Sequence, residues 1–336
     1  MATELGRSIG LGAVDDSAAL GFDSAKLDAV FAVQKKLIAD KLAAANAAII
    51  ARDGRVVYHR AAESGLAYDR PITDDTVFPI WSMSKPITSV AAMILFDRGA
   101  FKLDDPVADA LPELAKVRVK ADDGKTKPLA RPITYRDLLR HTSGFYGYDG
   151  AYNEDGFWAR TVKAKGLAKI IGELAREPIE HQPGAKYTYG RSTAVMGGAI
   201  GMLSGRPLDK FLWEELFRPL GMRHTWFYLS RDSRELFQPL TVLENGKLRV
   251  GKPEEDELPY EADSTLYLGG EGLVSTLGDY ARFCQMLVDR GKAPGGKPVI
   301  KPATLALMLA AQPEGIPGYD ERHKGHSLVL RCYVLA

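Results

Sequence analysis

The segment Ser82–Lys85, with the sequence Ser-Met-Ser-Lys, has the residue types and the spacing of an activated nucleophile. Pro86 has no N–H to donate and the apolar run 87–96 follows it, so a helix is predicted to begin at Ser82. Residues three apart lie on one face of a helix, which lets the Lys85 amine reach the Ser82 hydroxyl. The free N–H groups of the first turn place positive potential beside an oxygen that must become anionic. This pattern favours covalent catalysis, with Ser82 as the nucleophile and Lys85 as its base.

A Ser-x-x-Lys spacing by itself also fits a capped surface helix, because serine is a favoured N-cap and lysine is an ordinary exposed residue. The surroundings favour the catalytic interpretation. Residues 77–81 and 87–96 are strongly apolar, so Lys85 is expected beside a buried surface, where a desolvated amine can act as a general base.

Tyr189 is a second candidate for proton transfer. It lies in the segment Lys186–Ser192, after a turn at Pro183–Gly184, and is expected in a loop just before a helix. A phenol beside a cation can pass protons between a serine and a leaving group. The alternative from the sequence alone is a tyrosine packed in a loop.

Other catalytic arrangements find little support. Residues 190–194, Gly-Arg-Ser-Thr-Ala, lack the closing glycine of a Gly-x-Ser-x-Gly turn. The six histidines show no spacing typical of metal ligands, and His141 is interpreted as a loop histidine bonded to the backbone. No glycine-rich loop follows a predicted strand. The sequence therefore implies no metal and no cofactor.

Elements at both ends of the chain are predicted to form an antiparallel sheet with helices on it. Asp23 and Ser24 can cap a helix with apolar residues at helical spacing, and strands 47–51 and 56–59 flank an Asp-Gly turn. Between about 100 and 260 the pattern is one of short helices, which include a helix capped by Thr134 and the segments 192–203 and 208–216. Strand character is expected again over 267–276, followed by a helix over 277–288.

The composition is that of an ordinary globular protein of 336 residues, with 46% hydrophobic and 26% charged residues. The formal net charge is +1, so neither nucleic acid nor an anionic membrane is an expected partner. Cys284 is interpreted as a helix-packing residue, and two cysteines are too few for a disulfide framework. The acidic residues of Met1–Ala19 argue against a secretory signal, and no run of about 18 apolar residues is present. A cytoplasmic protein is expected; the oligomeric state stays open.

The motifs together resemble the superfamily of serine β-lactamases and penicillin-binding proteins, and most closely its class C-like carboxylesterases, called family VIII. The matching blocks are Ser82–Lys85, Ile133–Gly144, Pro183–Gly184 leading to Tyr189–Thr193, Pro219–Met222 and Gly269–Thr276.

The resemblance implies that Ser82 is acylated, that Lys85 assists its deprotonation and that Tyr189 is the proton shuttle. Arg191 stands where a class C β-lactamase has an asparagine that contacts the drug. The sequence Tyr-Gly-Arg-Ser-Thr at 189–193 is instead similar to the esterase branch. The family's third motif has no secure match. Residues 323–325, His-Lys-Gly, fit its letters, while residues 327–336 are expected to be the strand that precedes it, with the chain stopping short of the motif.

The resemblance implies a β-lactamase-like α/β (α+β) fold, an antiparallel sheet flanked by helices with an inserted, mostly helical lobe. Residues 20–100 with 265–336 are expected to form the α/β lobe and 101–264 the helical lobe, with 1–19 as an N-terminal extension. The implied function is hydrolysis of small carboxylic esters by Ser82, Lys85 and Tyr189. The alternatives are a β-lactamase, a D-alanyl peptidase or an acyltransferase of the same superfamily, or a non-catalytic relative that binds a ligand.

Overall fold

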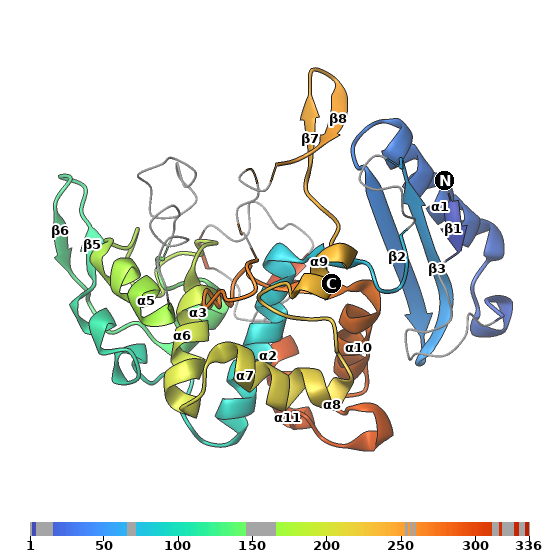
Figure 1. Ribbon diagram of the computed structural model, residues 1–336. Coiled ribbons are helices and arrows are strands. Elements are labelled where there is room, and N and C mark those ends of the chain that lie inside the picture. Colours follow the sequence, from blue (N-terminus) through green and yellow to red (C-terminus); the bar gives the residue numbers. More distant parts are fainter. Residues whose placement is uncertain are drawn as a thin grey trace. The chain divides into compact units, whose positions relative to one another are not determined.

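The computed structural model describes most of the chain and divides it into two compact units that alternate along the sequence (Figure 1). The described residues are 2–4, 16–65, 72–145, 166–252, 255, 258, 260–310, 316–317, 326–328 and 333–335. The first unit comprises Met1–Pro79, Leu220–Ala262 and Val274–Met286, and the second comprises Ile80–Pro219, Asp263–Leu273 and Leu287–Ala336. The lobe boundaries expected from the sequence stay a prediction.

The first unit is built on a three-stranded antiparallel sheet of order β1-β3-β2. Its strands are β1 (Ala2–Glu4), β2 (Ala45–Arg52) and β3 (Arg55–Glu63), and the helix α1 (Ser24–Ala39) packs on β2 and β3 (Figure 1). Asp23 caps α1 by accepting a hydrogen bond from Ala25 N at 2.9 Å. Asp53 and Gly54 both have positive φ (52° and 72°), which is the geometry of a two-residue hairpin turn. The predicted helix and hairpin are confirmed.

Further short elements complete the first unit. They are β4 (Val77–Pro79), which pairs antiparallel with β9 (Val274–Thr276), α9 (Arg231–Leu236), the hairpin β7 (Thr241–Glu244) and β8 (Lys247–Val250), and most of α10 (Leu277–Val288).

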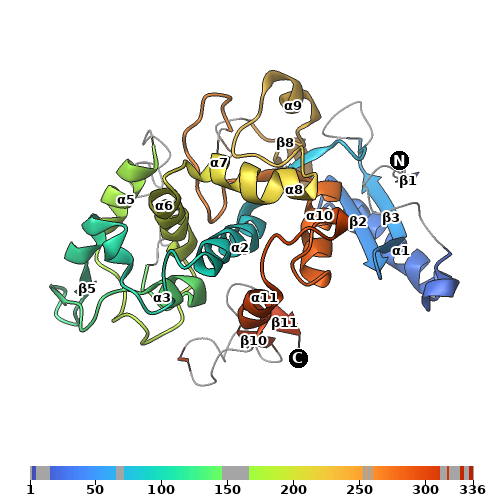
Figure 2. The same cartoon turned by 90° about the horizontal axis from the view of Figure 1, so that it is seen from below.

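The second unit is mostly helical and is centred on α2 (Ser84–Asp97), whose residues 87–95 are all buried. The helices α6 (Ser192–Ser204), α7 (Leu208–Leu212) and α11 (Pro302–Leu309) pack against α2, and α2 and α6 run side by side in Figure 2. Burial on several sides explains why the run after Pro86 has no polar face. The other elements are β5 (Arg118–Lys120), β6 (Thr126–Pro128), α3 (Tyr135–Arg140), α5 (Leu167–Arg176), α8 (Arg218–Leu220), β10 (His326–Leu328) and β11 (Tyr333–Leu335).

Several predictions of secondary structure are wrong in detail. Only β9 of the expected strand 267–276 is a strand; before it the chain turns, with Gly272 N donating to Leu268 O at 2.8 Å. The predicted strand 327–336 contains two short antiparallel strands, β10 and β11. Cys284 lies in the predicted helix α10, but it is exposed, because Phe283 and Met286 form the buried face of α10. Cys332 lies outside the described residues.

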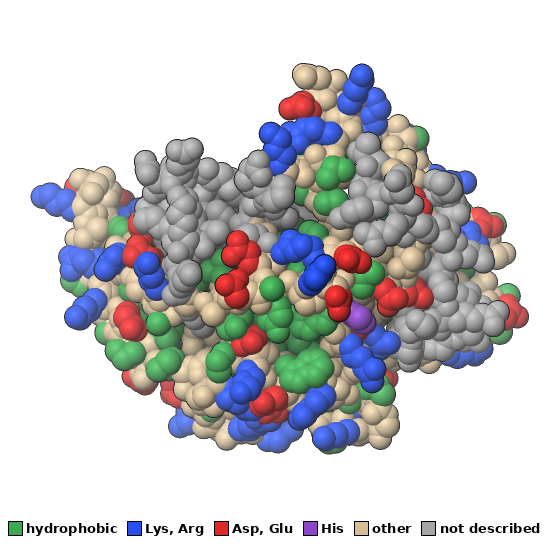
Figure 3. Space-filling view, in the orientation of Figure 1, with side chains coloured by type: hydrophobic (Ala, Val, Ile, Leu, Met, Phe, Trp, Pro, Cys, Tyr) green, Lys and Arg blue, Asp and Glu red, His purple; other side chains and the backbone are tan. Residues whose placement is uncertain are grey.

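Charged side chains of both signs are interspersed on the face of the molecule that Figure 3 shows. Among the described residues, no helix is both long enough and apolar enough to cross a membrane. The cytoplasmic location stays a prediction.

Candidate active site

Ser82 lies in a tight turn that leads into α2. The helix itself begins at Ser84, two residues later than predicted, and residues Trp81–Met83 form a single 3₁₀ turn before it. Trp81 has a φ of +44°, a left-handed conformation that costs a non-glycine residue on the order of 1–3 kcal/mol. Two hydrogen bonds hold the turn, from Ile80 N to Leu273 O (3.0 Å) and from Leu273 N to the Ser84 hydroxyl (3.1 Å). The turn leaves Ser82 exposed.

Lys85 is buried one turn further along, with only 3% of its side chain exposed. Its Nζ donates to Ser82 Oγ at 2.9 Å and to the carbonyl oxygen of Gly270 at 2.7 Å. The alternative of a solvent-facing surface lysine is therefore wrong. The backbone carbonyl and the serine hydroxyl hold the amine in one place.

Tyr189 reaches the same serine from the loop before α6. Its hydroxyl donates to Ser82 Oγ at 2.7 Å, and Lys85 Nζ lies 4.9 Å from the centre of its ring. The ring of His141 lies 4.8 Å from the Tyr189 ring, centre to centre, and His141 Nδ1 accepts a 3.4 Å hydrogen bond from Gly190 N. His141 thus contacts the backbone, as predicted, and packs against the tyrosine.

The chain segment Leu268–Leu273 supports Lys85 from the other side. The hydroxyl of Thr88 donates to Gly269 O at 2.7 Å, and Lys85 Nζ donates to the carbonyl oxygen of the next residue, Gly270. A Cβ at Gly269 would lie 2.9 Å from Thr193 O, so only glycine allows this approach to α6. Side chains of α2 thus bind two carbonyl oxygens of this segment, which turns where the sequence predicted a strand.

Glu271, in the same segment, is a residue to which the sequence analysis gave no role. Its Oε2 lies 3.6 Å from Lys85 Nζ, and 8% of its side chain is exposed. No described residue other than Lys85 contacts the Glu271 carboxylate in an ion pair or hydrogen bond. A nearly buried carboxylate with a single cationic partner fixes the position of that cation. The glycine-rich block around Glu271 was the available signal.

The structure therefore brings together the three residues that the sequence selected. Ser82 Oγ has two proton carriers within hydrogen-bond distance, which is the arrangement that nucleophilic catalysis by serine needs. Arg191 is buried at the start of α6. Residues 323–325 lie outside the described residues. Within the described part of the chain, no group of three or more acidic, histidine or cysteine side chains is arranged to hold a metal ion.

Comparisons with known proteins identify relatives of this chain. The chain matches the Beta-lactamase family model over residues 35–333. It is 35% identical over 246 residues to Protein Rv1367c of Mycobacterium tuberculosis, which covers 71% of this chain and 60% of the relative. It is 34% identical over 224 residues to Esterase EstB of Burkholderia gladioli, which covers 63% of this chain and 53% of the relative. The chain thus spans less than two thirds of the length of either relative.

Solved structures show the same fold. The structure titled EstCE1, a hydrolase with promiscuous acyltransferase activity, superposes with a TM-score of 0.72 at 24% identity, over 93% of this chain and 82% of that chain. Unliganded Simvastatin Synthase (LovD) from Aspergillus terreus has a TM-score of 0.72 at 22% identity, over 92% of this chain and 82% of that chain. The predicted β-lactamase-like fold, with its helices and antiparallel strands, is confirmed. Since the family model covers most of its length, the chain belongs to the Beta-lactamase family, as the motifs around Ser82 predicted.

Proposed function

We propose that the protein hydrolyses small carboxylic esters through an acyl-enzyme on Ser82. The observation that supports the proposal best is the convergence on Ser82 Oγ of Lys85 Nζ at 2.9 Å and the Tyr189 hydroxyl at 2.7 Å. The 34% identity to Esterase EstB favours an ester over other acyl substrates.

In the proposed mechanism, Lys85 reacts as the neutral amine. Ser82 Oγ attacks the ester carbonyl as its proton passes to Lys85 Nζ, directly or through the Tyr189 hydroxyl. Backbone N–H groups, one of them from Ser82, stabilise the oxyanion. The pair then protonates the departing alcohol, which leaves an acyl group on Ser82. Water attacks this acyl group as the same pair takes up one of its protons. The pair returns that proton to Ser82 Oγ as the bond from Oγ to the acyl carbon breaks, which releases the carboxylic acid and restores Ser82.

Replacement of Ser82 tests the proposal directly. Ser82→Ala should lower kcat for a p-nitrophenyl ester by on the order of 10⁴–10⁶-fold, the range seen when a nucleophile is lost. Mass spectrometry should find a fluorophosphonate adduct on Ser82 of the wild-type protein. Ser24 is exposed at the start of α1, so Ser24→Ala is a matched control that should keep both activity and labelling.

Full activity in Ser82→Ala would reject the proposal. Labelling of Ser82 with no turnover of any ester would instead favour the non-catalytic relative.

Transfer of the acyl group to an alcohol other than water is a second candidate. Acyltransferase calJ of Penicillium decumbens is 29% identical over 276 residues, covering 78% of this chain and 63% of the relative. Both reactions share the acyl-enzyme and differ in what attacks it. Added alcohol should therefore divert product from acid to new ester if transfer occurs, and should leave the acid yield unchanged if it does not.

A further inference from the structure

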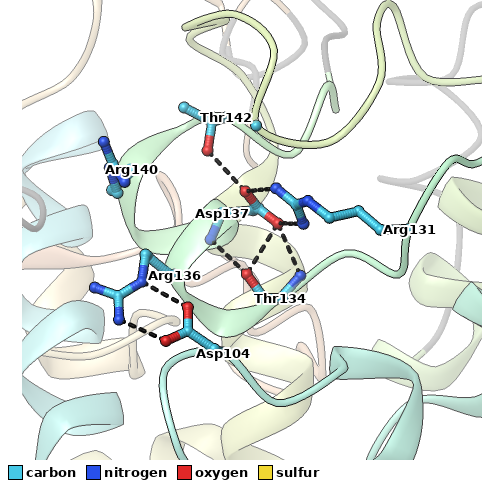
Figure 4. A pocket seen from close by; sticks show the side chains of 8 residues that line it. Asp104, Arg131, Thr134, Arg136, Asp137, Arg140 and Thr142 are labelled. Atoms are coloured by element: carbon cyan, nitrogen blue, oxygen red, sulfur yellow. Dashed lines mark hydrogen bonds and ion pairs between the residues drawn. The ribbon is translucent and has the colours of Figure 1, made fainter. Parts of the chain in front are cut away.

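A hollow of about 420 Å³ lies beside α3 (Figure 4). Neither Ser82, Lys85 nor Tyr189 lines it. The lining residues are polar and mostly charged: Asp104, Arg131, Thr134, Arg136, Asp137, Arg140, Thr142 and Gly184. Its size is within the range of small-molecule sites.

Two of the three arginines are each paired with one of the two carboxylates. Arg131 donates to both oxygens of Asp137, at 2.6 and 2.9 Å, and Arg136 donates to both oxygens of Asp104, each at 2.7 Å. Figure 4 shows both forked pairs. Such bidentate pairs are the strong form of this interaction.

Asp137 has no capacity left for another cation. It also accepts from Thr134 N (3.0 Å), the Thr134 hydroxyl (2.9 Å) and the Thr142 hydroxyl (3.0 Å). Burial raises the pKa of Asp137, but the hydrogen bonds from Arg131 and Thr134 outweigh it, and the net pKa is lowered. The hydrogen bond from Arg136 likewise lowers the pKa of Asp104. Both carboxylates are therefore charged at neutral pH, and each is balanced by its own arginine.

Arg140 is the remaining cation. It is half-buried, its Nε is buried without a hydrogen-bond partner, and no described residue forms an ion pair with it. It lies one turn after Arg136 on α3, which brings two like charges to one face of the helix. Burial, and then the charge of Arg136, lower the pKa of Arg140, although Asp137 and Asp104 act in the opposite direction.

The lining side chains thus have an excess of one positive charge, and it resides on a guanidinium with free N–H donors. A guanidinium presents its donors in a planar fork that matches the two oxygens of a carboxylate. A bound monoanion would satisfy the buried donor and offset the repulsion from Arg136. We propose that this hollow binds a small monocarboxylate whose oxygens accept hydrogen bonds from Arg140. The proposal is independent of the reaction at Ser82.

Saturation-transfer NMR of butyrate with the full-length protein tests the proposal. Ionic strength is held constant with chloride so that screening does not change. One charged contact predicts saturable binding with a dissociation constant on the order of 1–10 mM. Arg140→Met keeps the side-chain length without the charge, and should weaken binding at least about tenfold. Arg140→Lys keeps the charge without the fork and should bind more weakly than the wild type. Arg231→Met, at an exposed arginine of α9, should bind as the wild type does.

Far-UV circular dichroism and the urea denaturation midpoint report whether the Arg140 variants fold, so this control does not depend on the reaction at Ser82. Equal butyrate binding by the wild type and folded Arg140→Met would overturn the proposal. No saturable binding to the wild type up to about 50 mM would also overturn it, whatever the variants do. The binding of inorganic phosphate is measured on the same proteins. Tighter Arg140-dependent binding of phosphate than of butyrate would reject the assignment to a monocarboxylate.

Discussion

Ser82 Oγ is the point at which Lys85 and Tyr189 act on each other. Both donate to this one oxygen, so the loss of either donor is expected to change the hydrogen bonding of the other. Lys85→Ala and Tyr189→Phe should each reduce kcat/KM for a short-chain ester at least about tenfold, a loss of about 1.4 kcal/mol. The double variant should lose much less than the sum of the two losses. A double-mutant cycle on kcat/KM measures this coupling.

Additive losses in that cycle would reject the proton relay. So would a single variant that keeps more than about a tenth of the activity. Independent, small effects are what a packed tyrosine would produce.

Glu271 is expected to act through Lys85. Glu271→Gln keeps the shape but removes the charge that lies 3.6 Å from Lys85 Nζ, so the amine loses its only ionic partner among the described residues. We expect kcat to fall about ten- to hundredfold. KM should change little, because the glutamate is nearly buried against the lysine. Glu235→Gln, at an exposed glutamate of α9, is the matched control. Wild-type kcat in Glu271→Gln would show that Gly270 and Ser82 suffice to place Lys85.

The sequence predicted the members of this site that are close in the chain or belong to a known motif. Ser82 and Lys85 are one helical turn apart, which spacing alone can relate. Gly270 and Glu271 are about 185 residues from Lys85. No periodicity relates residues so distant, so their contacts with Lys85 became visible only in the fold.

The helix α3 shows how a local motif is tied into its surroundings. Thr134 and Asp137 form a reciprocal capping box, as the predicted Thr134 cap requires, and Arg131 completes the network on Asp137. The pKa of Asp137 is lowered in the folded protein. Its contribution to stability is therefore present above the carboxyl pKa of the unfolded chain, about 3.9, and is lost as the pH falls through the folded pKa.

Asp137→Asn should consequently cost about 3 kcal/mol of unfolding free energy at pH 7, as expected when a buried pair loses one partner. The difference from wild type should shrink as the pH falls below about 4. Urea denaturation at several pH values measures this difference in unfolding free energy. Asp104→Asn is the control, because Asp104 is 72% exposed and its pair should contribute less than about 1 kcal/mol. A difference for Asp137→Asn that does not change with pH would contradict the assignment to the charged pair.

Elements with strong local signals were predicted well, and elements set by tertiary contacts were not. The Asp-Gly turn and the Asp23 and Thr134 caps determine local structure by themselves. The segment before β9 has strand-like composition, but side chains of α2 donate hydrogen bonds to two of its carbonyl oxygens. Ser82 likewise lies in a 3₁₀ turn before α2, where Trp81 adopts a backbone conformation that no sequence pattern indicated.

At the scale of the whole chain, the residues at the motif positions indicate which class of substrate to expect. The block Ser82–Lys85 holds the predicted nucleophile and base, and the block Tyr189–Thr193 holds Tyr189, followed by Arg191 in place of an amide-binding asparagine. The family's third motif has no secure match in the sequence. On these residues we expect the site to be acylated by an ester more readily than by a β-lactam.

We accordingly expect kcat/KM for a p-nitrophenyl ester to exceed kcat/KM for a chromogenic cephalosporin, both measured on the 336-residue chain. A lost polar contact typically costs about 1–3 kcal/mol, so the substitution at Arg191 still permits weak lactam hydrolysis. Arg191→Asn restores the amide-binding residue alone, and should raise cephalosporin turnover without reversing the order of the two substrates. Cephalosporin efficiency equal to or above ester efficiency in the wild type would overturn the ester assignment, while leaving the acyl-enzyme on Ser82 intact. The comparison therefore separates the choice of substrate, which depends on several blocks of the chain, from the chemistry of the nucleophile.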